Sequence, residues 1–388
     1  MVNSNEFNTT KAATKGDQFT SFNVDDFQVP SGRDEVWRYI SLRSLRGLHD
    51  GTFSKVVEQN ISVSEQGGVK SEKVAPDDSR LGRAGAPADR VAAQAWTSMP
   101  TGQVITIDGD KQYDDAVVIT ITGAGDDVTS FGATSVEIGN HAEVTVVLNY
   151  QGSGTHADNV EFVIGDGAHV NVVVDADWDD DAVHLSHQVA SLGRDATLRH
   201  NAAIFGGEIV RMVPRVGFRA PGGDAELLGV YYASEGQYFE NRLLMDHSQP
   251  SCRSNVMYKG AIQGAPGSSK PDARSCWVGD ILIRSNAENT DTYEVNRNLL
   301  LTDGARADAI PNLEIETGEI AGAGHAATVG RFDDEQVYYL MSRGIPEGEA
   351  RRLIIRGFFL EIINRIPVQN LREDLAKRVD DELASISA

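Results

Sequence analysis

The chain has 388 residues, 40% of them hydrophobic, with 57 acidic and 35 basic side chains and a formal charge of −22. The negative charge repels phosphate groups and anionic lipid headgroups, which argues against nucleic acid and membrane surfaces as partners. The hydrophobic fraction is large enough to fill a sizeable core, which argues against a disordered chain.

Cysteine content and the N-terminal sequence indicate the cellular compartment of the protein. The two cysteines, Cys252 and Cys276, are isolated, and no cysteine or histidine cluster has the spacing of a structural zinc site. So few thiols favour a reducing environment. The N-terminus lacks the apolar core of a secretion signal, and no run of about 18 apolar residues could span a bilayer. These features predict a soluble cytoplasmic protein.

The first hundred residues predict a flexible segment followed by a small domain. Residues 1–30 are polar and are expected to be loose. Ser31 can cap a helix whose first turn is acidic and whose later residues have a one-sided apolar face. A short helix over Asp89–Trp96 closes a small N-terminal helical domain, which we place at residues 31–100.

From residue 101 the pattern changes to short β-rich runs separated by Gly, Asp and Asn. Four segments share a glycine, a polar turn, an alanine and an aliphatic residue, and their alanines are 26, 28 and 29 residues apart: Ala142, Ala168, Ala196 and Ala225. Such a repeat of short strands predicts a solenoid, with the glycine supplying an unusual backbone angle at each corner. The fold class is then mainly β, with a right-handed parallel β-helix core over residues 101–330. An antiparallel sandwich is the alternative.

After residue 330 the apolar period becomes about 3.6, which predicts a C-terminal helical domain over residues 331–388. Helices are expected to begin at Phe332, after Pro346 and at Leu371, the last one extending to Ile386. The middle helix has a wider apolar face than a small bundle needs, so part of it is predicted to bind a partner. The residues assigned to that role are Leu353, Ile354, Phe358 and Ile362.

Catalytic and nucleotide-binding signatures are absent from the sequence: it has no GxxxxGK[ST], no GxGxxG between a strand and a helix, no GxSxG and no HExxH. The densest acidic cluster is Asp175–Asp181, followed by His184 and His187. Its spacing does not match a calcium loop, and a solvated turn is the favoured interpretation. Because β-helix lyases and hydrolases of polysaccharides carry carboxylates on a strand face, the cluster supports an alternative enzyme hypothesis.

Several segments closely resemble one known family. They are NRNLLL at 296–301, PNLEI at 311–315, HAATVGR at 325–331, SRGI at 342–345 and, upstream, DH at 246–247 and YKG at 258–260. These segments resemble the SufB/SufD family of the SUF iron–sulfur cluster assembly system. The resemblance implies a right-handed parallel β-helix with helical ends, and a non-catalytic scaffold subunit rather than an enzyme.

Within that family the chain is similar to the SufD branch. SufB proteins carry a glutamate directly after the histidine and a cysteine in the preceding strand, where this chain has Ala326 and Asn296. Neither residue can supply a thiolate or carboxylate to iron. Many SufD proteins also have a cysteine where this chain has Ala323. The resemblance therefore implies that His325 is the contact to a transient Fe–S cluster, with no tightly bound cofactor.

The resemblance also implies two protein partners. A SufB-like paralogue is expected to pair with the β-helix end, and one copy of a SufC-like ABC-type ATPase is expected to dock on the C-terminal helical domain. A homodimeric scaffold that works without the paralogue is the second alternative, and a homodimer is also considered for the isolated chain. Neither nucleic acid nor membrane is expected as a partner.

Overall fold

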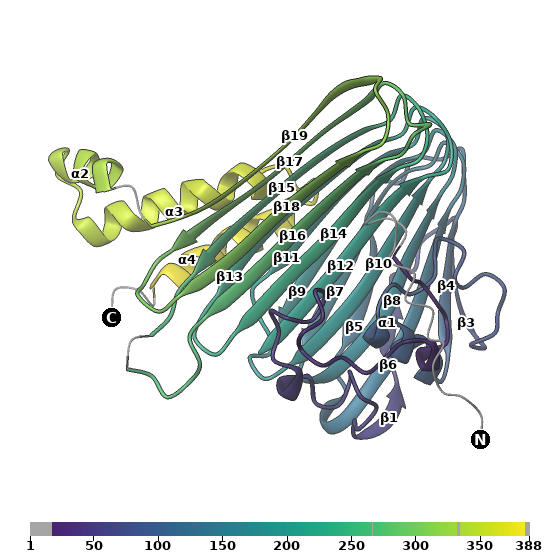
Figure 1. Cartoon of the computed structure of the whole chain (residues 1–388), viewed down its shortest axis with the longest axis horizontal. Helices are drawn as coiled ribbons and strands as arrows, with labels where there is room; N and C mark the ends of the chain where they lie inside the picture. The colour runs from purple at the N-terminus through teal and green to yellow at the C-terminus, as the bar shows by residue number, and fades with distance from the viewer. Residues whose placement is uncertain (1–17, 266, 332–333, 385–388) are drawn as a thin grey trace.

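The structure, a computed structural model, describes residues 18–265, 267–331 and 334–384. Its body is a β-solenoid made of two long sheets (Figure 1). One sheet contains β1 (Lys55–Glu58), β3 (Val69–Val74), β4 (Gly102–Ile107), β6 (Gly125–Ile138), β8 (Gly154–Ile164), β10 (Val183–Leu192), β12 (Ile209–Phe218), β14 (Tyr238–His247), β16 (Arg274–Ile283) and β18 (Arg306–Ile315). The other contains β2 (Asn60–Val63), β5 (Val117–Thr122), β7 (Glu143–Gly152), β9 (His169–Trp178), β11 (Thr197–Ile204), β13 (Asp224–Ala233), β15 (Arg253–Ile262), β17 (Thr290–Leu300) and β19 (Ile320–Gly330).

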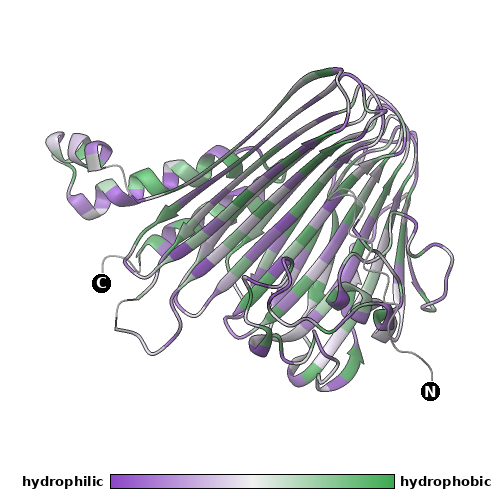
Figure 2. Ribbon diagram, in the orientation of Figure 1, coloured by the Kyte–Doolittle hydropathy of each residue, from purple (hydrophilic) through white to green (hydrophobic). Residues whose placement is uncertain are grey.

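Consecutive strands from β4 to β19 fall alternately in the two sheets, and within each sheet they pair in parallel and largely in register. This arrangement confirms the predicted parallel β-solenoid and excludes the antiparallel sandwich. Hydrophobic and hydrophilic residues alternate along many strands (Figure 2). Because successive side chains of a strand point to opposite faces, every second side chain points into the solenoid. The interior is a continuous apolar core of stacked residues such as Val144, Val170, Leu198 and Ala225.

The repeated glycine has the predicted positive φ only at Gly222, and at its other three positions it has a different role. Gly139 and Gly165 do not have positive φ, and the left-handed residue of these turns comes two positions later, at His141 and Gly167. A Cβ on Gly139 would lie 2.3 Å from the backbone N of Gly109 in the adjacent turn. The glycine is therefore required by the close stacking of turns. The repeated alanines are fully buried, as expected.

The N-terminal region differs from the predicted helical domain at 31–100. Its strands β1, β2 and β3 extend the solenoid sheets, with β2 antiparallel to β5 and β3 antiparallel to β4. The described residues also form two short 3₁₀ helices, η1 (Val24–Asp26) and η2 (Leu42–Leu45), and one helix, α1 (Arg90–Ser98). Residues 1–17 of the predicted flexible segment lie outside the described residues.

The helix predicted after Ser31 does not form. This stretch is a series of turns in which Trp37, Ile40, Leu45 and Leu48 are buried in a cluster with strands of the first sheet. The apolar side chains of this stretch pack on the surface of the first sheet. They can do so from a series of turns, so a regular helix is not needed to bury them. By contrast, α1 matches the predicted Asp89–Trp96 closely, and its N-cap is Asp89, whose side chain accepts a hydrogen bond from Ala92 N.

The C-terminal region consists of α2 (Asp334–Ser342), α3 (Glu347–Ile363) and α4 (Gln369–Ala384). Helices α3 and α4 pack on the outside of the second sheet, whereas α2 contacts α3 and projects away from the solenoid (Figure 1). The predicted start at Phe332 and the predicted end at Ile386 lie outside the described residues. Among the residues that are described, no helix is long and apolar enough to cross a membrane.

Candidate functional site

The two ends of the solenoid differ. At the N-terminal end, the short strands β1 to β3 extend and finish the sheets. At the other end β18 and β19 are the last strands, and no described strand pairs with their outer edges. Every residue of both strands is at least partly exposed, including Ile315 and Val329 at 43% each. We call this surface of β18 and β19 the open end. Uncovered edges present free backbone donors and acceptors to a further strand.

His325 lies at the open end, on β19, directly opposite Glu294 on β17. Because the two strands are parallel and in register, both side chains point to the same side of the sheet. The His325 side chain is 41% exposed, the Glu294 side chain is 0% exposed, and His325 Nδ1 lies 3.9 Å from Glu294 Oε1. The imidazole therefore forms an exposed layer over a buried carboxyl group.

Glu294 is held in an unfavourable environment. Burial and the neighbouring Asp280 carboxylate raise the pKa of Glu294 to about 8, although the backbone N–H of Asn312 opposes the shift. The Asn312 N–H lies near the carboxyl group, but neither carboxyl oxygen makes a hydrogen bond of normal geometry to the described residues. Gly279 leaves the space that the group occupies, because a Cβ there would lie 2.3 Å from Glu294 Oε2. A buried acid without hydrogen bonds is costly, so a structural role alone does not account for it.

Asn296, by contrast, is fully engaged in a structural network. Its Nδ2 donates to Tyr231 Oη at 3.1 Å, Tyr231 Oη donates to Asn298 Oδ1 at 2.6 Å, and Asn298 Nδ2 donates to Asn296 Oδ1 at 2.6 Å. The three groups close a ring of hydrogen bonds inside the solenoid. The position at which SufB proteins are expected to carry a cysteine is thus used for packing in this chain.

The two alanines near His325 also differ in position. Ala323 is two residues away, so it points to the same side as His325, and it packs against the solenoid core. Ala326 follows His325 directly and so faces the opposite side of the strand. Neither supplies a polar atom, so within the described residues the polar groups next to His325 on its side of the sheet come from β17.

The acidic cluster Asp175–Asp181 is not one site. Asp175 accepts two hydrogen bonds from Arg378 of α4, at 2.8 and 3.0 Å, and Asp177 lies 3.3 Å from the same guanidinium group. Burial raises the pKa of Asp175 in spite of Arg378. His184 points into the solenoid, where it meets Asp158, and His187 lies on the outer face. The first carboxylates of the cluster, Asp175 and Asp177, therefore attach α4 to the sheet.

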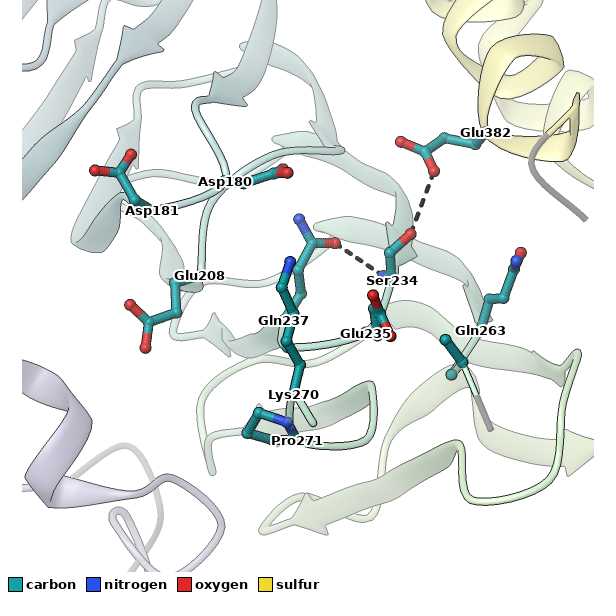
Figure 3. A pocket seen from close by; sticks show the side chains of 13 residues that line it. Asp180, Asp181, Glu208, Ser234, Glu235, Gln237, Gln263, Lys270, Pro271 and Glu382 are labelled. Atoms are coloured by element: carbon teal, nitrogen blue, oxygen red, sulfur yellow. Dashed lines mark hydrogen bonds between the residues drawn. The ribbon is translucent and has the colours of Figure 1, made fainter. Parts of the chain in front are cut away.

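The end of the same cluster borders a cavity of about 720 Å³ (Figure 3). Asp180 and Asp181 line it together with three glutamates, Glu208, Glu235 and Glu382, and with Lys270. Ser234 Oγ donates to Glu382 at 3.2 Å, which connects α4 to the turn after β13. The five carboxylates of the lining disfavour anionic ligands.

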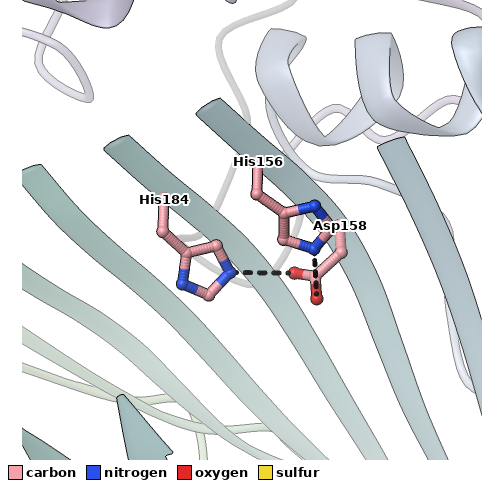
Figure 4. Close-up of side chains that lie close together, drawn as sticks. All are labelled: His156, Asp158 and His184. Atoms are coloured by element: carbon pink, nitrogen blue, oxygen red, sulfur yellow. Dashed lines mark ion pairs between the residues drawn. The ribbon is translucent and has the colours of Figure 1, made fainter. Parts of the chain in front are cut away.

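A group of two histidines and an aspartate lies inside the solenoid (Figure 4). His156 Nε2 is 3.4 Å from Asp158 Oδ2, and His184 Nε2 is 3.5 Å from Asp158 Oδ1. None of the three side chains is more than 1% exposed. Two imidazoles and one carboxylate are a common metal-binding set, so the positions of the protons decide what this group does.

The surrounding hydrogen bonds assign those protons. Trp178 Nε1 can only donate, and it lies 3.0 Å from His184 Nδ1, so neutral His184 carries its proton on Nε2, facing Asp158. Tyr150 Oη also donates to Asp158, at 2.9 Å. Although burial opposes it, the neighbouring His156 and His184 imidazoles hold the pKa of Asp158 below its usual range. The Asp158 carboxylate is therefore held inside the solenoid by the polar side chains around it.

The four predicted partner-binding residues on α3 differ in exposure. Leu353 is 40% exposed, and Ile354 and Phe358 are partly buried. Ile362 is 1% exposed and packs in the core between α3 and the second sheet, so its side chain is not available to a partner. Its assignment as a partner contact is corrected accordingly, because its side of the helix faces the sheet.

Helix α2 carries exposed apolar residues that the sequence patterns did not single out. Tyr338 is 75% exposed, Tyr339 57% and Met341 41%. Together with Leu353 on the contacting helix α3, these residues form what we call the α2–α3 surface. Exposed large apolar side chains are typical of protein-binding sites.

These features define a class: a parallel β-solenoid with one open end and a helical projection, both suited to protein contacts. Residues 120–358 match the family described as SUF system FeS cluster assembly, SufBD core domain. The chain belongs to this SufBD family, whose members are components of iron–sulfur cluster assembly.

Individual relatives agree with this assignment. An iron–sulfur cluster assembly SufBD family protein of Mycobacterium bovis is 55% identical over 96% of this chain and 94% of its own length. The iron–sulfur cluster assembly protein SufD of Bacillus subtilis is 27% identical over 72% of this chain and 63% of its own length. A second SufBD family protein of Mycobacterium bovis is 26% identical over 57% of this chain and 25% of its own length.

Proposed function

We propose that the chain is a non-catalytic scaffold subunit of a SUF complex, similar to SufD. It pairs through its open end with a SufB-like paralogue, and it docks a SufC-like ABC-type ATPase on its C-terminal helices. The observation that carries the proposal is the open end itself, where two uncovered terminal strands present the exposed imidazole of His325.

The paralogue has support from the shape of the sheets and from the relatives. A second β-solenoid with its own uncovered strands would continue both sheets and satisfy the edge hydrogen-bonding groups. Two SufBD family proteins of Mycobacterium bovis are similar to this chain, one along its length and one only distantly. A heterodimer of two such chains is the simplest assembly that uses both.

The ATPase has support from the α2–α3 surface. Its exposed tyrosines and Leu353 offer an apolar contact area on a projection that makes few other contacts. The sequence contains no phosphate-binding loop, so any ATP hydrolysis in the complex comes from a partner. In this arrangement, movement of the ATPase is transmitted through α3 and α4, which pack on the second sheet.

The iron–sulfur cluster is cargo in this function. His325 would contact the nascent cluster at the paired ends, where thiolates and carboxylates of the partner complete the ligand set. Cys252 and Cys276 do not contribute ligands, because both are buried and burial raises the pKa of both thiols.

Affinity capture of the tagged chain from a native extract, followed by mass spectrometry, tests the proposal. The expected result is one complex that contains a paralogous SufBD chain and an ABC-type ATPase. Capture of the chain alone, or only as a homodimer, from cells that express the paralogue would refute the proposed function.

A further inference from the structure

The arrangement of Glu294 under His325 is a consequence of the solenoid stacking. Glu294 and His325 are register partners on adjacent parallel strands, so their side chains project from the same side one rung apart. His325 Nδ1 lies 3.9 Å from Glu294 Oε1, and the carboxyl group is completely buried beneath the half-exposed imidazole. A ligand at the open end would therefore meet the imidazole first and the carboxylate directly behind it.

This separation fits two ligands of one metal ion. Nitrogen and oxygen ligands lie about 2.1 Å from a first-row divalent ion, so two ligand atoms of the same ion are at most about 4.2 Å apart. At the usual angles between ligands they lie about 3.0–3.4 Å apart, and a small rotation of the exposed imidazole covers the difference. The carboxyl group does not need to move.

The lack of hydrogen bonds to the Glu294 carboxyl group also supports a metal ion at this site. Both of its oxygens are buried, and although the Asn312 N–H is nearby, neither oxygen makes a hydrogen bond of normal geometry to the described residues. Buried polar atoms in folded proteins are almost always paired, so two orphaned oxygens in one carboxyl group require an explanation. A cation supplies it, and the nearby Asp280 carboxylate adds further negative charge.

The chemistry of the two groups defines the ion. An imidazole with a carboxylate favours divalent iron, manganese, cobalt or zinc over the soft ions that prefer thiolates, such as copper(I). Because His325 is exposed at the open end, the remaining coordination positions face outward, where a partner chain or sulfide can fill them.

We propose that Glu294 and His325 together bind a divalent metal ion, ferrous iron in the assembly reaction, so that this chain supplies a carboxylate as well as an imidazole. The proposal rests on the proposed function, in which His325 is the contact to iron. It extends that function by assigning to the chain alone a mixed-ligand site that exists before the partner binds.

Titration of the purified full chain with Co²⁺, a spectroscopic probe for this type of site, tests the proposal. The parent chain is expected to develop the visible absorption of Co²⁺ with nitrogen and oxygen ligands. Glu294→Gln and His325→Ala are each expected to weaken binding at least about tenfold, since each removes one of two ligands. Glu294→Asp, which withdraws the carboxylate by one methylene, is expected to weaken it less. Glu319→Gln is the matched control, because this carboxylate is exposed near the same end and belongs to no pair with His325.

Two results would overturn the inference. One is a parent chain that binds no Co²⁺ at millimolar concentration, and the other is a Glu294→Gln variant with parental affinity and spectrum. Capture of the paralogue and ATPase is measured on the same variants, and Glu294→Gln is expected to retain both because Glu294 has no exposed surface. If the complex forms but Glu294→Gln binds Co²⁺ normally, only this inference fails. If the parent captures no partner, the proposed function fails whatever the titration shows.

Discussion

The repeated glycines in the turns were correctly predicted to mark the corners of the solenoid, but the predicted reason for a glycine there was not correct at every corner. The repeated glycines mark the solenoid corners, but Gly165 is required by contact with the neighbouring turn rather than by its own backbone angle. A sequence shows that a glycine recurs, and it does not show which atoms lie opposite. That information depends on the stacking of segments separated by a whole repeat.

Gly165→Ala is expected to destabilise the chain by about 2 kcal/mol, because the new Cβ overpacks a backbone that cannot move aside. In the structure this Cβ would lie 2.6 Å from Asn140 N. Urea unfolding followed by circular dichroism measures the change. Gly357→Ala is the control: this glycine is exposed within α3 and has open space around its Cβ position. It is expected to stabilise by about 1 kcal/mol, and equal effects at the two sites would contradict the stacking argument.

Buried histidines predict a dependence of stability on pH. Burial lowers the pKa of His187 to about 3, and it lowers the pKa of His200 and of His247 to about 4. In the unfolded chain the same groups titrate near 6.5, so the unfolded state binds protons first as pH falls. The stabilisation is complete above pH 6.5 and is lost progressively towards pH 4. Urea midpoints measured from pH 7.5 to 4.5 are expected to fall, and a constant midpoint would be inconsistent with neutral buried imidazoles.

At the scale of elements, the C-terminal helices depend on a few polar attachments to the sheet. Arg378 of α4 binds the buried Asp175 of β9, and Lys259 of β15 donates to the Phe358 carbonyl oxygen of α3 at 2.9 Å. The periodicity of each helix was visible in the sequence. The face each helix turns to the sheet was not, because α3 is apolar on more than one side, and this is why Ile362 was assigned to a partner.

Arg378→Met is expected to destabilise the chain by about 3 kcal/mol, because it leaves the buried Asp175 without its counter-charge. Loosening of α4 should be detectable by limited proteolysis as well as by thermal unfolding. The double variant Asp175→Asn with Arg378→Met is expected to recover part of the loss, since no buried unpaired charge remains and the other two carboxylates that Arg378 contacts, Asp177 and Asp374, are about half exposed. A double variant that is as unstable as the sum of the two single variants would show that the pair is not coupled.

The α2–α3 surface predicts a separable ATPase contact. Tyr338→Asp and Leu353→Asp each place a charge on this surface, and they are expected to abolish capture of the ATPase while capture of the paralogue is retained. Val29→Asp is the control, because this side chain is equally apolar and is 52% exposed on the N-terminal segment. Retained ATPase binding by both α2–α3 variants would place the ATPase contact elsewhere.

At the scale of the whole molecule, the difference between the two ends is the main functional feature. The chain finishes its sheets with short antiparallel strands at the N-terminal end and leaves β18 and β19 uncovered at the other. Natural proteins usually protect long edge strands, because free edges promote aggregation. An end left open on both sheets is therefore best explained by a partner that covers it.

The open end predicts a paralogue contact that is independent of the ATPase. Lysine substitutions at Ile315 and Val329, both 43% exposed, introduce charge at the ends of β18 and β19. The double variant is expected to lose capture of the paralogue and to keep capture of the ATPase. Light scattering after gel filtration would show whether the isolated parent chain is a homodimer and whether the variant is a monomer. A variant that still captures the paralogue would move the interface away from the open end.

The sequence by itself determined the local features: the change of period from two to about 3.6 near residue 330, the short strands, the repeat and the helix near Asp89–Trp96. The sequence also indicated the protein family, through short segments concentrated near His325. These depend on neighbours along the chain, so they can be read without the fold.

Only the tertiary structure decided which residues lie opposite one another across a turn of the solenoid. Glu294 and His325 are far apart in sequence, and the register of β17 and β19 brings them to 3.9 Å. The irregular length of the turns hides that register in the sequence. The same stacking placed Gly165 against Asn140 and separated His184 from Asp175. A single residue pattern cannot specify such contacts, because they depend on the summed length of every intervening turn.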